Sequence, residues 1–150
     1  MKNNQKVVLI TGCSSGIGRE SAHYLVKKGY RVYALSRTPE KLSDIASENL
    51  YPIKVDITDK DSINTALEKI NHVDVLVNNA GYGLVSTVEE VSEAQMLQQF
   101  DVNVFGVLRM CKAIIPKMRK QEAGVIINIS SFLGKIGLPL LTFTMLVNMQ

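Results

Sequence analysis

The sequence predicts an α/β protein with a doubly wound parallel sheet. Two observations lead to this fold class. Short apolar, β-branched segments alternate with segments of helical periodicity, and such alternation implies parallel strands joined by right-handed crossovers. In addition, a glycine-rich turn follows the first of these strands, Lys6–Ile10, and opens a helix that ends near Gly29.

The remaining elements follow in chain order. Further strands are expected at Arg31–Ser36, Tyr51–Val55, Val73–Val77 and Gly124–Ser130. Further helices are expected over 39–47, over 61–70, after an N-cap at Ser92, and over 102–119, where Pro116 ends or kinks the helix. The predicted strand order is 3-2-1-4-5, which is the order of a Rossmann fold, with the last strand at an edge.

Length and composition exclude several classes of protein. With 150 residues, 46% hydrophobic and 21% charged, the chain is expected to form one globular domain over residues 1–150. A dispersed net charge of +3 does not favour nucleic acid or a membrane surface as partner. Two distant cysteines without metal-ligand spacing suggest a reduced, cytoplasmic protein with no metal site. No signal peptide or membrane span is visible.

The glycine-rich turn reads Thr-Gly-Cys-Ser-Ser-Gly-Ile-Gly over residues 11–18. Glycines let a backbone approach a pyrophosphate, and a helix N-terminus directs free N–H groups at its negative charge. An ordinary turn is the alternative, but the strand before and the helix after it favour dinucleotide binding. The residues expected to bind the cofactor here are Gly12, Ser14, Ser15, Gly16, Ile17 and Gly18.

The end of the second strand bears on the choice of cofactor. An acidic residue there would bind both ribose hydroxyls of NAD, whereas this chain has Ser36 followed by Arg37. A guanidinium forms charge-assisted hydrogen bonds with phosphate, so the pair suits the 2′-phosphate of NADP. A solvated surface arginine is the alternative. The sequence therefore predicts NADP or NADPH in preference to NAD.

The spacing Thr-Gly-x-x-x-Gly-x-Gly resembles the short-chain dehydrogenase/reductase family, and the likeness extends from Lys6 to about Phe143. Asn-Asn-Ala-Gly after the fourth strand matches a motif of that family. The resemblance implies cofactor contacts by Asp56, Ile57, Asn79, Ala80 and Gly81, and catalytic roles for Asn103 and Ser131. Taken singly, Asn103 could bond to backbone within a helix, and Ser131 could be a helix cap or a turn residue.

The family's chemistry uses a Tyr that exchanges the hydroxyl proton while hydride moves to or from nicotinamide. A Lys four residues later holds the ribose and lowers the pKa of the Tyr from about 10. The Ser orients the carbonyl, and the Asn helps to hold a proton-relay water. Counting from Ser131 places the Tyr at 144 and the Lys at 148, where this chain has Thr144 and Asn148. The chain as it stands is therefore expected to be inactive.

The last eight residues suggest a cause for this departure. A family-like continuation, Phe-Tyr-Asn-Ala-Ser-Lys-Tyr-Ala-Val-Glu, has TTT TAC AAT GCT AGT AAA TAT GCA GTA GAA as one permitted coding. Deleting one T from it gives Phe-Thr-Met-Leu-Val-Asn-Met-Gln-stop, which matches residues 143–150. We expect a frameshift, an aberrant tail over 143–150 and a fold that lacks its C-terminal strands. A natural apolar tail is the alternative.

The resemblance implies an NADP-dependent oxidoreductase that transfers hydride between nicotinamide and a secondary alcohol or ketone. The segments 78–83 and 104–109 look most like the branch that acts on apolar substrates similar to retinoids or steroids. A small-molecule substrate is expected, and a homo-oligomer for a full-length family member. The alternatives are a non-catalytic nucleotide-binding module and a fragment without function.

Overall fold

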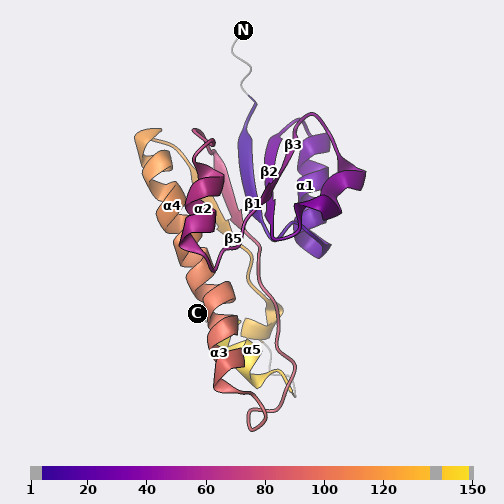
Figure 1. Ribbon diagram of the computed structural model, residues 1–150, viewed down its shortest axis with the longest axis vertical. Coiled ribbons are helices and arrows are strands. Elements are labelled where there is room, and N and C mark those ends of the chain that lie inside the picture. The colour runs from indigo at the N-terminus through magenta and orange to yellow at the C-terminus, as the bar shows by residue number, and fades with distance from the viewer. Residues whose placement is uncertain (1–4, 136–139, 149–150) are drawn as a thin grey trace.

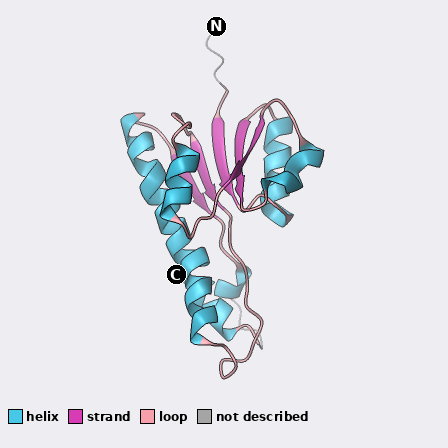
Figure 2. Cartoon of the chain, in the orientation of Figure 1, coloured by secondary structure: helices cyan, strands magenta, loops and turns pink. Residues whose placement is uncertain are grey.

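The computed structural model describes residues 5–135 and 140–148. Five parallel strands form one sheet in the order β3-β2-β1-β4-β5, with helices on both faces (Figures 1 and 2). The strands are β1 (Val7–Thr11), β2 (Arg31–Ser36), β3 (Leu50–Lys54), β4 (Val75–Asn78) and β5 (Val125–Asn128). This confirms the predicted fold class and strand order.

The helices fall into three groups (Figure 1). One face of the sheet carries α1 (Gly16–Lys27) and the 3₁₀-helix η1 (Pro39–Ile45). The other face carries α2 (Lys60–Leu67) and α4 (Val107–Lys120). Beyond the end of the sheet lie α3 (Glu93–Phe100), the π-helix η2 (Asp101–Gly106), the 3₁₀-helix η3 (Phe132–Gly134) and α5 (Thr142–Asn148).

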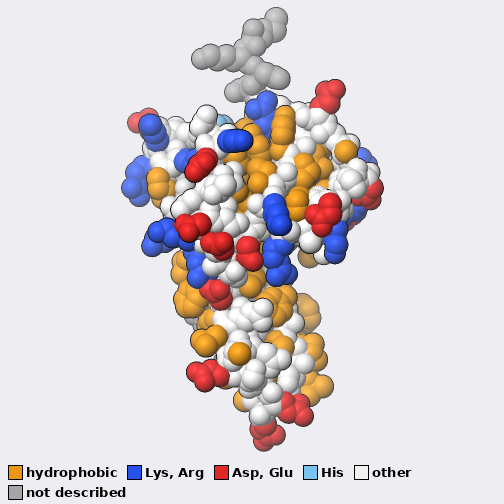
Figure 3. Space-filling model, viewed as in Figure 1, with side chains coloured by type: hydrophobic (Ala, Val, Ile, Leu, Met, Phe, Trp, Pro, Cys, Tyr) orange, Lys and Arg blue, Asp and Glu red, His pale blue; other side chains and the backbone are white. Residues whose placement is uncertain are grey.

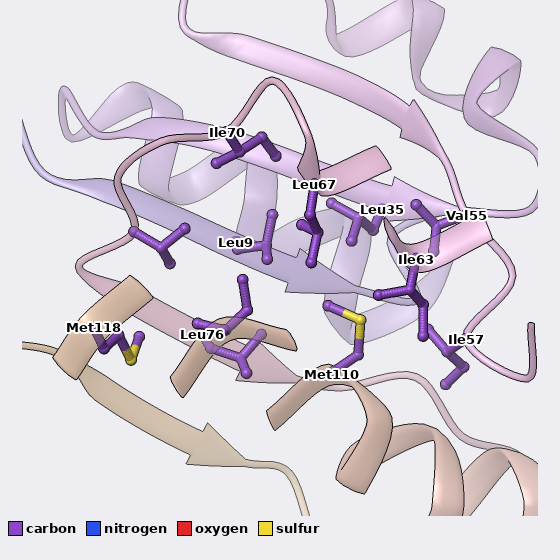
Figure 4. Packing of buried hydrophobic residues seen from close by; sticks show 12 residues of the cluster. Leu9, Leu35, Val55, Ile57, Ile63, Leu67, Ile70, Leu76, Met110 and Met118 are labelled. Carbon is purple, nitrogen blue, oxygen red and sulfur yellow. The ribbon is translucent and has the colours of Figure 1, made fainter. Parts of the chain in front are cut away.

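The core has two layers, one on each face of the sheet. On the side of α2 and α4, Leu9 and Leu76 of the sheet pack with Met110 (Figure 4). On the side of α1, Ile10 packs with Ala22 of that helix. All five residues of β1 are buried, as expected for the central strand of a parallel sheet that is covered on both faces.

The register of the strands brings their carboxyl ends to one edge of the sheet. Thr11 at the end of β1 pairs with Leu35 of β2, and Asn78 at the end of β4 pairs with Asn128 of β5. The glycine turn, the residues after β2 and the loop after β4 therefore emerge side by side. In doubly wound sheets, ligands bind at this edge.

The predicted long helix over 102–119 differs from the structure in two ways. Its first part is the π-helix η2, and its second part, α4, continues through Pro116 to Lys120. Proline removes one backbone hydrogen bond from a helix. The Pro116 side chain is exposed, whereas Ile114 and Met118 on either side of it pack into the core. Tertiary burial thus overrides the local signal to stop.

Three smaller differences concern element boundaries and the tail. The expected helix over 39–47 is a 3₁₀-helix that ends at Ile45, and α1 begins at Gly16, at the glycine turn itself. Within the expected aberrant tail, α5 is helical to Asn148, and residues 149 and 150 lie outside the described residues. In the part of the chain that the structure describes, no helix combines the length and apolar character needed to cross a membrane.

Candidate cofactor-binding site

A cleft of about 750 Å³ lies at the carboxyl ends of the strands. Of the fifteen residues predicted for the site, fourteen line it: Gly12, Ser14, Ser15, Gly16, Ile17, Ser36, Arg37, Asp56, Ile57, Asn79, Ala80, Gly81, Asn103 and Ser131. Tyr82, Val102, Leu133 and Thr144 extend the lining beyond the predicted set. The structure thus gathers residues from every loop at this edge, and their individual roles stay predictions.

The glycine turn is packed tightly against the loop after β4. Gly12 has a φ of +72°, and a Cβ there would lie 2.7 Å from the Cα of Ala80. A Cβ on Gly18, the predicted residue that does not line the cleft, would collide with the Asn79 side chain and the Gly12 carbonyl. Gly18 therefore lets α1 approach the turn, and only glycine fits at either position.

Thr11 and Asn79 join the turn to that loop by four hydrogen bonds. The buried Thr11 Oγ1 accepts from the backbone N–H groups of Asn79 and Ala80, each at 3.0 Å. Asn79 Nδ2 donates to the carbonyl oxygens of Thr11, at 3.0 Å, and Gly12, at 3.4 Å. The side-chain amide of Asn79 therefore fixes the backbone of the glycine turn. Thr11 is the first residue of the Thr-Gly-x-x-x-Gly-x-Gly motif, but the sequence alone predicted no role for it.

Cys13, inside the turn, is structural. It is buried, its N–H donates to the Leu35 carbonyl at 3.1 Å, and its Sγ lies 3.2 Å from the Ile10 carbonyl as donor. Burial raises the pKa of this thiol to about 12. The thiol is thus protonated and unreactive near neutral pH.

Two features of the cleft suit an anionic nucleotide. Ser15 precedes α1 without a side-chain cap bond, so the first N–H groups of that helix are open to a ligand at the positive end of its dipole. The hydroxyl of Ser36 is buried and has no hydrogen-bond partner among the described residues, although it lines the cleft beside the exposed Arg37. An unpartnered buried hydroxyl is costly unless a ligand satisfies it. The residues present therefore fit a nicotinamide dinucleotide.

The loop after β3 is held by its own hydrogen bonds. Asp56 Oδ1 accepts from the hydroxyl of Thr58 at 2.7 Å and from its N–H at 2.9 Å. The Thr58 hydroxyl, above all, lowers the pKa of Asp56, and the charges of Arg37 and Arg109 add to this. A Cβ on Gly106 of η2 would lie 2.6 Å from Ile57 Cδ1, so this loop and the π-helix are in close contact.

Asn103 lies in η2, and both polar atoms of its side chain bond to one backbone unit. Its Oδ1 accepts from the N–H of Tyr82 at 3.1 Å, and its Nδ2 donates to the Tyr82 carbonyl at 2.8 Å. Asn103 therefore fixes the loop after β4 on the side of the cleft remote from the glycine turn. Backbone bonding was the alternative that the sequence left open for this residue.

Ser131 lines the cleft and is also the N-cap of η3. Its Oγ accepts from the N–H of Leu133 at 3.2 Å. The cap was the second reading that the sequence allowed. The catalytic role stays a prediction.

Thr144 is buried, with 2% of its surface exposed, and its hydroxyl makes three hydrogen bonds. It accepts from Leu84 N–H at 2.7 Å and from Gln99 Nε2 at 3.0 Å, and it donates to the Leu84 carbonyl at 2.8 Å. Its capacity to donate and accept is thus used inside the protein. Asn148 Nδ2 bonds back to the Thr144 carbonyl at 2.6 Å, within α5.

Sequence reasoning missed Gln99. This side chain is fully buried and also donates to the carbonyl of Tyr82, at 3.0 Å. It precedes Asn103 by one helical turn, so the two amides face the same way and share one acceptor. The four-residue spacing of two amide residues was the available signal.

The profile of the family described as short chain dehydrogenase matches residues 6–143. The chain belongs to the short-chain dehydrogenase family. It is 42% identical over 141 residues to a 3-ketodihydrosphingosine reductase of Bacteroides thetaiotaomicron, covering 89% of this chain and 50% of the relative. It is 43% identical over 143 residues to human retinol dehydrogenase 8, covering 88% and 46%.

Solved structures of the family agree with this fold. A short-chain dehydrogenase from Streptomyces avermitilis superposes with a TM-score of 0.90 at 35% identity, covering 97% of this chain and 56% of that one. The protein ElxO, solved with NADP bound, gives a TM-score of 0.86 at 29% identity, covering 97% and 63%. The chain spans about half the length of the curated relatives it matches.

Proposed function

We propose that the cleft binds NADP(H), with the adenosine side held at Ser36, Arg37, Asp56 and Ile57. The observation that carries the proposal is the buried, unpartnered hydroxyl of Ser36 beside an exposed arginine. A 2′-phosphate would accept from both groups, and the arginine would supply charge-assisted bonds. The NADP-bound ElxO structure, a member of the same fold, supports the choice.

The activity that we propose for the intact family member is oxidoreduction of a secondary alcohol or ketone of apolar character. The bound nicotinamide would supply or accept the hydride, while Ser131 would orient the carbonyl from the β5 side of the cleft. Tyr82, Val102 and Leu133 give this end of the lining apolar surface. One relative is named as a reductase of 3-ketodihydrosphingosine and another as a retinol dehydrogenase, which supports such a substrate.

The present chain, we propose, binds the cofactor without turning it over. The position of the family's proton donor holds Thr144, whose hydroxyl has no ionisation near neutral pH and already bonds to Leu84 and Gln99. The position of the ribose-binding Lys holds Asn148, which bonds within its own helix. Asn103 and Ser131 then remain as parts of a site that lacks its acid.

Calorimetric titration with NADP⁺ and with NAD⁺ tests the cofactor assignment. Replacing Arg37 with Ala should cost about 1.5–3 kcal/mol of NADP⁺ binding, the range for a hydrogen bond to a charged group, and hardly change NAD⁺ binding. Arg119→Ala is the matched control, because Arg119 is exposed on α4, away from the cleft. Equal losses for both cofactors would make Arg37 structural, and no binding of either cofactor would reject the proposed function.

Two further experiments separate the alternatives. Oxidation of NADPH with a panel of ketones distinguishes an enzyme from a non-catalytic module, and cofactor binding distinguishes that module from a fragment without function. We also propose that a full-length family member self-associates through α4 and η2, because they expose Phe105, Leu108 and Ile115, at 48%, 53% and 38% of their surfaces. Sedimentation of the full-length protein tests it. A cytoplasmic location stays a prediction.

A further inference from the structure

The π-helix η2 contacts the cleft at two points. Asn103 reaches the backbone of Tyr82, and Gly106 lies so close to Ile57 that a Cβ would come within 2.6 Å of its Cδ1. Relative to an α-helix, a π-turn contains one extra residue, which rotates the side chains that follow by about 100°. The direction in which the side chains of α4 leave the helix therefore depends on the π-turn. A π-turn is rare in proteins, so the contacts that hold it in place also bear on the contacts of Asn103 and Gly106.

Arg109 donates two hydrogen bonds to Asp101, the first residue of the π-helix. Its Nη2 donates to Asp101 Oδ1 at 2.6 Å, and its Nη1 donates to the Asp101 carbonyl oxygen at 3.3 Å. The guanidinium is a planar fork, so the two bonds fix both the position and the orientation of Asp101. Both side chains are about two-thirds buried, with 31% and 35% of their surfaces exposed. The bridge spans the whole of η2, from its first residue to the first turn of α4.

The charge of the same guanidinium acts on the loop after β3, which η2 contacts where Gly106 meets Ile57. That charge is one of the causes that lower the pKa of Asp56, after the hydrogen bonds from Thr58 and the charge of Arg37. Arg109 therefore bonds to Asp101 of η2, and its charge also acts on Asp56 of the loop after β3.

We propose that Arg109 is a positioning residue, whose grip on Asp101 maintains the π-turn and thereby holds Asn103 against Tyr82 and Gly106 against Ile57. The consequence for cofactor binding rests on the proposed function of the cleft. The consequence for the Asn103–Tyr82 contact does not, because that contact forms without any ligand. The alternative is an ordinary surface ion pair, which would contribute little and act on nothing else.

Hydrogen exchange of the Tyr82 amide tests the proposal in the cofactor-free chain, because this N–H donates to Asn103 Oδ1. In Arg109→Met, exchange at Tyr82 should become at least tenfold faster, while the central β1 amides such as Leu9 keep their protection. Arg109→Lys retains the charge but lacks the fork, so an intermediate rise of about threefold is expected. Arg119→Met removes an equivalent charge from the exposed end of α4 and serves as control.

Titration with NADP⁺ forms the second arm. Arg109→Met should weaken binding three- to tenfold, and Arg119→Met should leave it unchanged. If the parent chain binds no NADP⁺, the proposed function fails, and the exchange rates alone still decide the role of Arg109. Exchange at Tyr82 in Arg109→Met that matches Arg119→Met would overturn the proposal. Should Arg109→Met not fold, Arg109→Lys decides, and an unchanged rate there would overturn the proposal equally.

Discussion

Two regions of the molecule are held together by different forces. The sheet body consists of the five strands with α1, α2 and α4, and its strands and helices meet in apolar layers. The projection consists of residues 81–106, 132–135 and 140–148, which extend beyond the end of the sheet (Figures 1 and 3). There, Val85 and Leu97 expose 70% and 61% of their surfaces, and hydrophobic side chains show over much of the projection in Figure 3.

In the projection, several hydrogen bonds hold the loop that follows β4. Tyr82 is bound by Gln99 and Asn103, and Leu84 is bound by Thr144. Such a bond contributes about 1 kcal/mol net, whereas a buried leucine contributes about 1.5–3 kcal/mol by burial alone. The side of the cleft at the glycine turn is therefore fixed by the core. The opposite side depends on these polar contacts together with a few apolar ones, such as the edge-on pair of Phe100 and Phe143 and the buried Val147.

Activity should show the largest difference between the regions. The chain should not oxidise NADPH with ketones, because loss of a positioned general acid lowers the rate by about 10²–10⁴. Thr144→Tyr with Asn148→Lys should not restore turnover, because Thr144 is buried and its Cγ2 lies 3.5 Å from where a Cβ on Gly83 would stand. A Tyr ring does not fit in that space without displacing the loop.

The control for that assay is the frame-restored protein that the sequence predicts, measured beside the 150-residue chain. It should turn over NADPH with at least one apolar ketone. Comparable turnover from both proteins would show that the chemistry does not depend on the Tyr and Lys, and would contradict the separation of the two regions.

Stability should depend on the sheet body far more than on the projection. Leu9→Ala in the centre of β1 should lower the free energy of unfolding by about 2–5 kcal/mol, because Leu9 is fully buried beneath α2 and α4. Leu97→Ala, the same change on the exposed face of α3, should change it by less than about 0.5 kcal/mol. Urea unfolding measures both. Similar losses would mean that the projection has its own apolar core.

The exposed apolar side chains on and just after the edge strand β5 should limit the solubility of the chain. On β5 and just after it, Val125, Ile127 and Ile129 are 53%, 44% and 46% exposed, and β5 is an edge strand. Such an edge favours association, so the parent chain should be poorly soluble, and Ile127→Lys should raise the soluble yield at nearly unchanged stability. Ile126→Lys, on the face that packs against the core, should instead destabilise the fold. A parent chain that stays monomeric at high concentration would contradict this.

The sequence predicted the sheet body well because its signals are local. Continuous apolar runs mark buried parallel strands, and the glycine spacing after β1 marks a turn that only glycine can form, as the φ of Gly12 confirms. The cleft followed from topology, since strand ends meet at one edge. The frameshift interpretation of the tail stays a prediction, which the nucleotide sequence of the gene would test.

Only part of the projection could be predicted in the same way. The predicted N-cap Ser92 is confirmed at the start of α3, where its hydroxyl accepts from the N–H of Gln95. The π-turn depends on Arg109 reaching back to Asp101, and the state of Thr144 depends on Leu84, sixty residues earlier in the chain. Neither pairing leaves a periodic pattern. Pro116 was expected to end or to kink the helix. The end is wrong, because α4 continues to Lys120 with Ile114 and Met118 buried on either side of the proline.

Acidification should have the smallest effect. The carboxylates whose pKa is lowered include Asp56, mainly through the Thr58 hydroxyl, and Asp44, mainly through Arg19. A carboxylate with a lowered pKa stabilises the fold above its unfolded value of 3.8, and the contribution is lost as the pH falls through the folded pKa.

Urea midpoints at about pH 5 and about pH 3 should therefore fall slightly for the parent chain, by less than the loss caused by Leu9→Ala. Asp56→Asn keeps an oxygen acceptor for Thr58 without an ionisable proton, so its midpoint should fall less between the two pH values. Asp44→Asn should behave like the parent, because the Asp44–Arg19 pair is exposed to solvent and screened. If Asp44→Asn, and not Asp56→Asn, removed the fall in the midpoint between the two pH values, the surface pair would outweigh Asp56, and the assignment of acid sensitivity to the loop after β3 would be wrong.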